Sequence, residues 1–378
     1  MGGNAGGMDA LTTAAAPQWD RFAHWARLPA RLLLAVLVLL IIAAAQVPIN
    51  AGPSTVKTRN FVEVLVDADG GPARKRDDDL ALYDRAIARI SRGEHYYDFI
   101  VEEQRKANYP VRPGLAVRLP TLAYLDAWLG VPGQIGAAIL LLAAVTVAWW
   151  RRLGEEPGAL RYRRLAMAVL LLGASLGLNR DFFVLHELWA GMLLALSFGL
   201  HRPGKFTASL LVAALALAIR EHALPFVLLM AAIAWWRGDR REALDWGLLV
   251  AVFLAALAVH LRIIASQTLP SDPLSASWLE LRGLSGWLSN VVLSSNLRFL
   301  PHWLAGPAVV LAIAGWAGWR SAAGTFGALL YLGYGAAFMI VGRGDNFYWG
   351  FMVAPALFVG LVFAPMALKS LWRASARR

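Results

Sequence analysis

Long continuous runs of apolar residues alternate with short clusters of charged residues along most of the chain. A run of about 20 apolar residues is long enough to cross a bilayer as an α-helix. The runs lack the apolar–polar alternation of a membrane β-barrel, and only helices and closed barrels satisfy their backbone hydrogen bonds in lipid. The pattern therefore predicts an all-α polytopic membrane protein with about ten transmembrane helices, at residues 31–48, 133–150, 165–179, 185–200, 206–219, 223–236, 246–263, 303–319, 324–341 and 347–368.

Lysine and arginine residues between these runs fall on one side of the predicted arrangement. Cytoplasmic loops carry an excess of such residues, which sets the orientation. We therefore expect cytoplasmic tails at 1–30 and 369–378 around a single transmembrane domain at 31–368. Two long polar segments, 49–132 and 264–302, then form large extracytoplasmic loops. The basic residues on the cytoplasmic side are Arg151, Arg152, Arg161, Arg163, Arg164, Arg202, Lys205, Arg237, Arg240, Arg241, Arg320, Lys369, Arg373, Arg377 and Arg378.

The composition agrees with a membrane protein and excludes several kinds of chemistry. Hydrophobic residues make up 58% of the chain, the mean hydropathy is +0.53 and 16% of residues are charged. Cysteine is absent, which excludes disulfides, thiolate nucleophiles and thiolate metal ligands. The net charge of +11 does not indicate nucleic-acid binding, because the basic residues form no continuous stripe with aromatic residues. The first apolar run, 32–47, lacks a convincing small-residue cleavage site, so we expect a retained span.

Three short loops on the expected extracytoplasmic side each hold an arginine beside an acidic residue. The loops are NRDFFVLHE (179–187), REH (220–222) and GRGDNFYW (342–349). Arginine is disfavoured on that side, and polar residues near the membrane are costly and usually functional. We therefore expect the loops to converge on a site at the extracytoplasmic surface. The alternative is that each arginine snorkels or pairs with its neighbour, as Arg180 with Asp181, Arg220 with Glu221 and Arg343 with Asp345.

The first long loop contains a segment with the pattern of an amphipathic helix, DDDLALYDRAIARISRGEHYY (77–97). Its apolar residues recur at helical spacing, and Gly93 is a natural stop signal. Such a helix is suited to lie on the membrane surface. Asp79 stands where an N-cap residue is expected, so its carboxylate has a structural explanation beside any functional one. The apolar stripe consists of Leu80, Tyr83, Ile87 and Ile90.

The order of features in this loop resembles a known family. An acidic residue is followed four positions later by a tyrosine, then by a helix end ARI…G and by the return YPVRPGLAVRLPTLAYL (109–125). This order is similar to the first extracytoplasmic loop of the GT-C superfamily of integral-membrane glycosyltransferases, which includes protein O-mannosyltransferases and aminoarabinose transferases of lipid A. That family commonly carries an Asp-Glu pair before the tyrosine. Here Leu80 follows Asp79, so Asp78 or Asp84 is left to supply the second acid.

The resemblance implies transfer of a sugar from a polyprenyl-phosphate carrier to a hydroxyl group outside the cytoplasm. Such a reaction needs a carboxylate base near the acceptor hydroxyl and fixed cations near the phosphate leaving group. Arginine suits phosphate because its planar guanidinium binds two oxygens at once. We expect Asp79 as the base, with Asp78, Asp84 and Glu187 as alternatives. The expected substrate-binding residues are Arg180, Arg220, Arg343, His186, Glu221, Tyr96, Tyr97, Asn346 and Tyr348.

The expected partners are a polyprenyl-phosphate-linked sugar, a hydroxyl group of a glycan, lipid or protein, and the bilayer of a bacterial inner (plasma) membrane. We expect no metal site, because His186 and Glu187 are adjacent and do not face the same way on a helix. Some family members need a divalent cation, so one remains an alternative cofactor. The tyrosines have a further alternative as an aromatic belt at the membrane interface.

Three other classes of protein compete with a glycosyltransferase. A transporter or lipid-linked sugar flippase would place its polar residues near the middle of the bilayer in broken helices. In this chain the charges gather at one end of the expected spans. An acyltransferase or polymer ligase would instead depend on His186 or His222 as its base. A non-catalytic assembly subunit would tolerate point changes on the extracytoplasmic side.

Overall fold

The computed structural model describes residues 20–49, 78–156 and 158–377, except for the side chains of Asp78 and Asp79. Within these ranges the protein is helical, and the only β-type pairings are isolated bridges. The main helices are α1 (Arg27–Gln46), α3 (Asp78–Ser91), α4 (Tyr96–Lys106), α5 (Thr121–Glu155), α6 (Arg163–Ala174), α7 (His186–Leu200), α8 (Thr207–Ile219), α9 (Leu224–Trp236), α10 (Arg240–Gln267), α11 (Gly283–Leu293), α12 (His302–Gly318), α13 (Ala322–Ile340), α14 (Ala354–Leu357) and α15 (Ala364–Ala376).

Several helices are long and apolar enough to cross a membrane, which indicates a helical membrane protein. In the described part of the chain four helical segments meet this length: α1, α5 with the short turn before it, α10 and α13. There is a fifth if Gly344–Met352 and Ala354–Val362 together form one span. The chain bends by 55° between these two short helices. The physical reason is that about 20 apolar residues match the hydrocarbon thickness.

The expected number of ten spans is not confirmed, because other apolar helices are shorter than a full crossing. Helices α7, α8, α9 and α12 contain 13 to 17 residues. Helix α6 has 12 residues and passes into a 3-10 turn at Ser175. Polar groups at the break between α8 and α9 interrupt what would otherwise be longer apolar helices.

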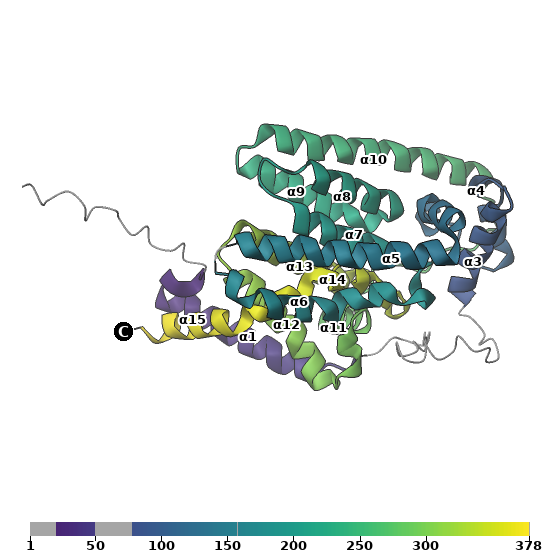
Figure 1. Cartoon of the computed structure of the whole chain (residues 1–378). Coiled ribbons are helices and arrows are strands. Elements are labelled where there is room, and N and C mark those ends of the chain that lie inside the picture. Colours follow the sequence, from purple (N-terminus) through teal and green to yellow (C-terminus); the bar gives the residue numbers. More distant parts are fainter. Residues whose placement is uncertain (1–19, 50–77, 157, 378) are drawn as a thin grey trace, which may run out of the picture.

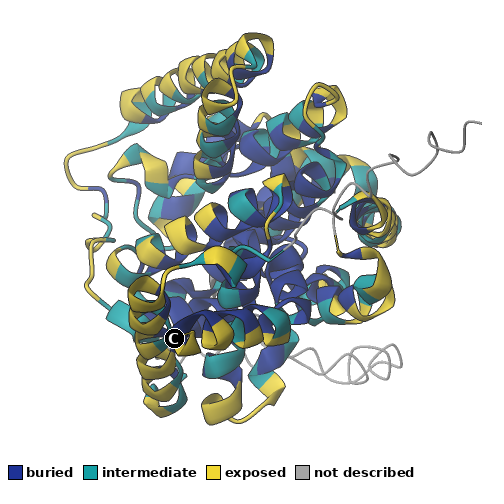
Figure 2. Ribbon diagram, turned by 90° about the vertical axis from the view of Figure 1, so that its left-hand side faces the viewer, coloured by how far each residue is buried: buried dark blue, intermediate teal, exposed yellow. Residues whose placement is uncertain are grey.

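The helices pack side by side around α7 (Figure 1). Helix α10 runs along one edge beside α9, and α1 lies at the opposite edge beside α12 and α15. Helices α3 and α4 lie together at one end, against α5 and the last turns of α10. Figure 2 shows buried residues gathered in the interior and exposed residues on the outer faces. Interlocking aromatic rings fill the centre, where Trp149 packs edge-on against Phe198 and Trp316.

The bent segment 344–362 is mostly buried in this interior, and glycines on the neighbouring helices allow it to pack closely. A Cβ atom on Gly191 of α7 would lie 1.9 Å from the Phe351 carbonyl oxygen. One on Gly173 of α6 would lie 1.8 Å from the Ala354 carbonyl oxygen. Only glycine permits backbones to approach this closely. The segment therefore carries its first residues to the same end of the molecule as α3.

The expected amphipathic helix at 77–97 is present as α3, and the chain then turns at Gly93 into α4. Gly93 has a φ of +92°, a backbone conformation that favours glycine. Leu80, Leu82 and Ala86 of α3 are buried, and the helix packs against α5. The chain is already helical at Asp78, where the described residues resume, so Asp79 lies inside α3 and not at the N-cap that the sequence indicated. The reason is that helical conformation extends further towards the N-terminus than the apolar stripe.

Candidate functional site

A cavity of about 320 Å³ opens at the end of the molecule where α3 lies. Its walls come from five parts of the chain that are distant in sequence. They are α3 with the end of α4, the segment before α5, the turn between α8 and α9, the segment after α10, and the segment that follows α13. The lining includes Tyr83, Tyr109, Arg118, Arg220, Glu221, His222, Trp278, Arg343, Asp345, Asn346, Tyr348 and Trp349.

A buried arginine between two carboxylates forms the floor of the cavity. Arg220 follows the last residue of α8 in extended conformation, and its side chain is 1% exposed. Its Nη2 atom lies 2.8 Å from Oε1 of Glu187, which is also 1% exposed, at the start of α7. Its Nη1 atom donates to Glu221. Neither Nη2 of Arg220 nor Oε1 of Glu187 has a hydrogen bond of regular geometry, so their contact is an ion pair with imperfect alignment.

A second arginine reaches the cavity with much of its hydrogen-bonding capacity uncommitted. Arg118 lies in the segment before α5, and its side chain is 14% exposed. Its Nε atom donates to the Tyr83 hydroxyl at 3.0 Å. Its Nη2 atom is 3.9 Å from Oε1 of Glu187, at the limit of an ion pair. A guanidinium has five N–H donors, so Arg118 retains donors for a further acceptor in the cavity.

The segment after α13 contributes a third arginine, held by its neighbours. Arg343 pairs with Asp345 through both carboxylate oxygens, at 3.2 and 3.1 Å. The Asn346 side chain accepts from the Arg343 backbone amide at 3.1 Å and donates to the Tyr348 hydroxyl at 3.2 Å. This network fixes Tyr348 in the wall of the cavity. The half-exposed ion pair leaves Arg343 near the mouth, where solvent screens it.

Aromatic rings cover much of the remaining wall. The His222 ring lies 4.4 Å from the Trp349 ring, between centroids, and the Tyr334 hydroxyl donates to the His222 carbonyl at 2.6 Å. Tyr83 and Trp278 add two further ring faces. Flat apolar rings beside convergent polar groups are typical of sites for small polar molecules.

The segment between α10 and α11 is fastened across one side of the cavity. The Ser275 backbone amide donates to the Arg112 carbonyl at 2.7 Å, and the Gly342 backbone amide donates to the Trp278 carbonyl at 2.7 Å. Arg105 of α4 donates to both carboxylate oxygens of Asp272. The bond from Arg105, together with the Leu269 amide, lowers the pKa of Asp272 to about 2. We call residues 272–278 the strap.

The structure brings together some of the residues that the sequence indicated. Arg220, Arg343, Glu221, Asn346 and Tyr348 line the cavity, and Glu187 lies directly behind Arg220. Both Arg220 and Arg343 pair with their acidic neighbours, as the alternative interpretation expected, and still face the cavity. The side chains of Asp79 and Asp78 lie outside the described residues. The backbone of α3 places Asp79 one helical turn before Tyr83.

Other expected residues lie elsewhere. Arg180 is exposed and outside the cavity lining. Tyr97 shares a hydrogen bond with His260 at 3.0 Å, and Tyr96 is buried and donates to the Arg118 carbonyl at 2.7 Å. Both tyrosines therefore support the packing of α4 and not the cavity wall. Asp84 faces α5, and His186 packs behind Tyr83 with 5.5 Å between ring centroids.

The interpretation of the sequence missed Arg118, Tyr83 and Trp278 as site residues. Arg118 and Tyr83 stood inside quoted stretches, but nothing local distinguished Arg118 from the neighbouring Arg112. Arg112 donates to the Asp272 carbonyl, which belongs to the strap. Only the packing of the strap and α3 decides which of the two arginines faces the cavity.

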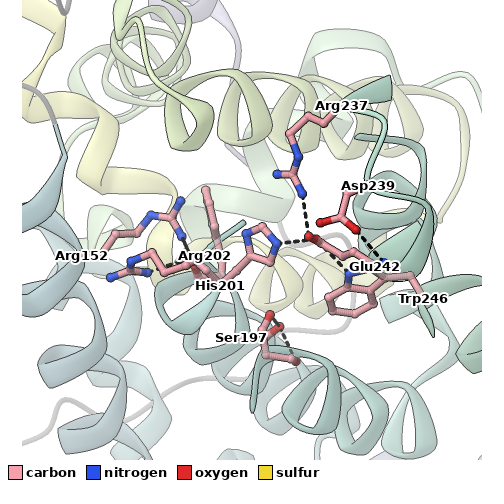
Figure 3. Close-up of polar contacts among 10 residues, drawn as sticks. Arg152, Ser197, His201, Arg202, Arg237, Asp239, Glu242 and Trp246 are labelled. Atoms are coloured by element: carbon pink, nitrogen blue, oxygen red, sulfur yellow. Dashed lines mark hydrogen bonds and ion pairs between the residues drawn. The ribbon is translucent and has the colours of Figure 1, made fainter. Parts of the chain in front are cut away.

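A second buried polar cluster lies at the opposite end of α7 (Figure 3). Glu242 of α10 is fully buried. Its carboxylate oxygens form hydrogen bonds with the His201 ring at 2.7 Å, the Arg237 guanidinium at 2.7 Å and the Trp246 indole N–H at 3.4 Å. Arg152 of α5 donates to the His201 carbonyl at 2.8 Å. This cluster joins α5, α7, α9 and α10, and every carboxylate oxygen of Glu242 is bonded.

The cavity combines cationic donors, carboxylates and aromatic rings, and its polar groups are suited to a molecule with a phosphate and hydroxyl groups. Among the described residues no group of three or more histidine, aspartate or glutamate side chains is placed to hold a metal ion. Comparison of the chain with protein-family models, with curated proteins and with solved structures gives no match.

Proposed function

We propose that the protein is a membrane glycosyltransferase that moves a sugar from a polyprenyl-phosphate carrier to a hydroxyl group on the extracytoplasmic side of the membrane. The observation that carries this proposal is Arg118, a poorly paired guanidinium that faces a cavity beside Tyr83, one turn along α3 from Asp79. An uncommitted cation next to a surface helix with acidic residues is the pairing that phosphate departure and proton abstraction require.

The dimensions and walls of the cavity support this class of substrate. About 320 Å³ falls at the lower end of the range for small-molecule sites and is enough for one sugar ring with its phosphate. In the proposed reaction Arg118 and Arg220 stabilise the phosphate as it gains charge. The rings of Trp278, Tyr348 and Trp349 contact the sugar. Asp79 accepts the proton of the acceptor hydroxyl.

The ion pairs at the floor of the cavity would serve this reaction by fixing the position of the Arg220 guanidinium. Arg220 lies between Glu187 and Glu221, so its orientation is fixed before substrate enters. Groups fixed in advance need no reorganisation when charge develops, which makes them effective in a site that excludes water. The carbon chain of the carrier would remain in the bilayer beside the cavity, among exposed apolar residues such as Leu279 and Leu281.

The test is the envelope glycan and glycolipid profile of a deletion strain. The strain is complemented at matched membrane levels with the wild-type chain, with Asp79→Asn, with Arg118→Gln and with Arg180→Gln. The proposal expects one sugar to be missing in the deletion strain. It expects the wild type and Arg180→Gln to restore it, because Arg180 lies outside the cavity, and the other two variants to fail.

Two outcomes would contradict parts of the proposal. An unchanged glycan profile in the deletion strain would remove the glycosyltransferase assignment and favour a transporter or an assembly subunit. Restoration by Asp79→Asn, with Arg118→Gln still inactive, would keep the reaction but move the base to another carboxylate.

A further inference from the structure

A second, much smaller cavity lies behind the main one. Its volume is about 10 Å³, and Asp126, His186 and Tyr96 are among its lining residues. Tyr83 and Arg118 line both cavities and so form the wall between them. A space of this size is close to what one water molecule needs, provided that several polar groups surround it.

Two buried polar side chains facing this small cavity have no hydrogen bond of regular geometry. Asp126 is 2% exposed, and neither carboxylate oxygen has a hydrogen bond. His186 is 4% exposed, and neither ring nitrogen has a hydrogen bond of regular geometry. Gln134 donates at 3.5 Å to the Asp126 backbone carbonyl, and its amide also approaches the carboxylate without a hydrogen bond of regular geometry. Buried polar groups are nearly always hydrogen-bonded, so two such groups around one small space indicate a function or a bound water molecule.

A third carboxyl group links this pair to the surface. Asp84 of α3 is partly exposed and lies near enough to Asp126 for the two carboxyl groups to interact. Asp84 directly follows Tyr83, so the two side chains leave α3 on different sides. Tyr83 faces the main cavity, and Asp84 faces α5. Tyr83 lines both cavities, Asp126 lines the small one, and Asp84 interacts electrostatically with Asp126.

The remaining charged and titratable neighbours of Asp126 are few. Tyr83 and Asp84 approach from α3, Tyr96 from α4, Arg118 from the segment before α5 and His186 from α7. The Arg118 guanidinium donates to Tyr83 and approaches Glu187, and its backbone carbonyl accepts from Tyr96. The presence of Arg118 in the wall disfavours a bound cation, so water is the fitting occupant.

We propose that Asp126, with His186 beside it and Asp84 behind it, forms a proton path that carries the acceptor's proton from the main cavity to solvent. The proposal rests on the proposed glycosyl transfer. The acceptor O–H bond breaks as Asp79 takes the proton, and the oxygen's electron pair forms the new bond to the sugar. The bond between the sugar and the carrier phosphate breaks in the same step, and its electron pair leaves with the phosphate. The Tyr83 hydroxyl then receives that proton and releases its own through water to Asp126, which passes one on to Asp84. No electrons are transferred along the path, and Asp79 regains its charge.

The first test does not depend on transfer activity. The full chain is purified, placed in lipid nanodiscs and examined by infrared difference spectroscopy across pH and after exchange into deuterium oxide. We expect a carbonyl band of a protonated, buried carboxylic acid that is lost in Asp126→Asn. The exposed Asp98→Asn serves as the matched control and should keep the band. Retention of the band in Asp126→Asn would overturn the proposal.

Asp84→Asn keeps Asp126 in place and tests the exit of the path. The deuterium-induced shift of the Asp126 band should develop more slowly in this variant than in the wild type, because the surface end of the path is blocked. An equal exchange rate would overturn the assigned route. Asp84→Asn also guards against a misfolded Asp126→Asn, since it changes a partly exposed residue.

The second test measures sugar transfer by the same variants as a function of pH. Asp126→Asn should lower transfer by about 10²-fold and change its pH profile, whereas Asp98→Asn should change neither. A band lost in Asp126→Asn with sugar transfer absent from the wild type would contradict the proposed function but not the buried proton site. A band lost with transfer and pH profile unchanged would contradict the proton path while keeping the glycosyltransferase.

Discussion

A buried glutamate cluster lies at each end of helix α7, and the two clusters differ in how completely they are paired. At one end Glu242 binds His201, Arg237 and Trp246, and both of its oxygens are bonded (Figure 3). At the other end Glu187 contacts Arg220 at 2.8 Å and Arg118 at 3.9 Å without regular hydrogen bonds. Only the second cluster borders a cavity of about 320 Å³.

The comparison separates a structural role from a functional one. Buried charges are stable only when they are paired and hydrogen-bonded, so a fully bonded cluster such as that of Glu242 stabilises the junction of its helices. A cluster that has unpaired N–H donors facing a cavity can still bind a charged ligand. The incomplete pairing of Arg118 and Glu187 therefore says more about function than the number of charges at either end.

Replacing the spare cation should have the largest effect. Arg118→Gln should lower sugar transfer by about 10³-fold, or about 4 kcal/mol of transition-state stabilisation, because the phosphate loses a fixed donor. The unfolding temperature should stay near that of the wild type, since among the described residues the guanidinium has a single hydrogen bond, to Tyr83. The checks are glycan analysis and thermal unfolding in detergent. A normal rate would show that both glutamate clusters are structural.

The opposite cluster should respond in stability. Glu242→Gln should lower the free energy of unfolding by about 3 kcal/mol, because His201 and Arg237 lose a buried carboxylate. Sugar transfer per folded molecule should not change. Glu155→Gln, which affects an exposed pair with Arg202, is the control and should cost about 0.5 kcal/mol or less. Chemical denaturation of the purified protein measures both. A loss of transfer at matched folded levels would contradict the purely structural role of this cluster.

A double-mutant cycle should show a moderate coupling within the cavity floor. The combined Arg220→Gln and Glu187→Gln variant should be more stable than the sum of the single changes by about 1–2 kcal/mol, because each single change strands a buried charge. The Arg343 and Asp345 pair, which is partly exposed, serves as the control and should show a coupling near about 0.5 kcal/mol. Equal coupling in the two cycles would mean that burial of the floor does not strengthen its ion pair.

The strap should give the smallest effect, visible only at low pH. The pKa of Asp272 is lowered to about 2 by Arg105, so the contact contributes fully above the ordinary carboxyl pKa of about 4 and is lost as pH falls through 2. Pepsin should therefore nick residues 272–278 at about pH 2 but not at about pH 4. Asp272→Asn should be nicked at both, and Asp98→Asn should behave as the wild type. Nicking of the wild type at the higher pH would show that other contacts, not Arg105, hold the strap.

Sequence reasoning succeeded where the determining physics is local. Apolar runs and their composition indicated a helical membrane protein, and the spacing of apolar residues with Gly93 predicted α3. Arg220 and Arg343, which the sequence predicted to lie on one side of the membrane, both line the cavity, whereas Arg180 does not. The number of full-length spans was not confirmed, because breaks such as those beside Arg220 and Ser175 depend on packing against other helices.

What the sequence by itself determined is the helical, apolar character of the chain, the amphipathic helix of the first loop and the set of charged loops that can meet. Hydropathy and helical periodicity act over one or two turns, so they can be read along the chain. Tertiary structure alone decided which charges are paired. Arg118 faces the cavity while Arg112 holds the strap, and the Asp126 carboxylate is buried without a hydrogen bond of regular geometry. Pairing depends on contacts within about 4 Å between segments far apart in sequence, and no local pattern specifies those contacts.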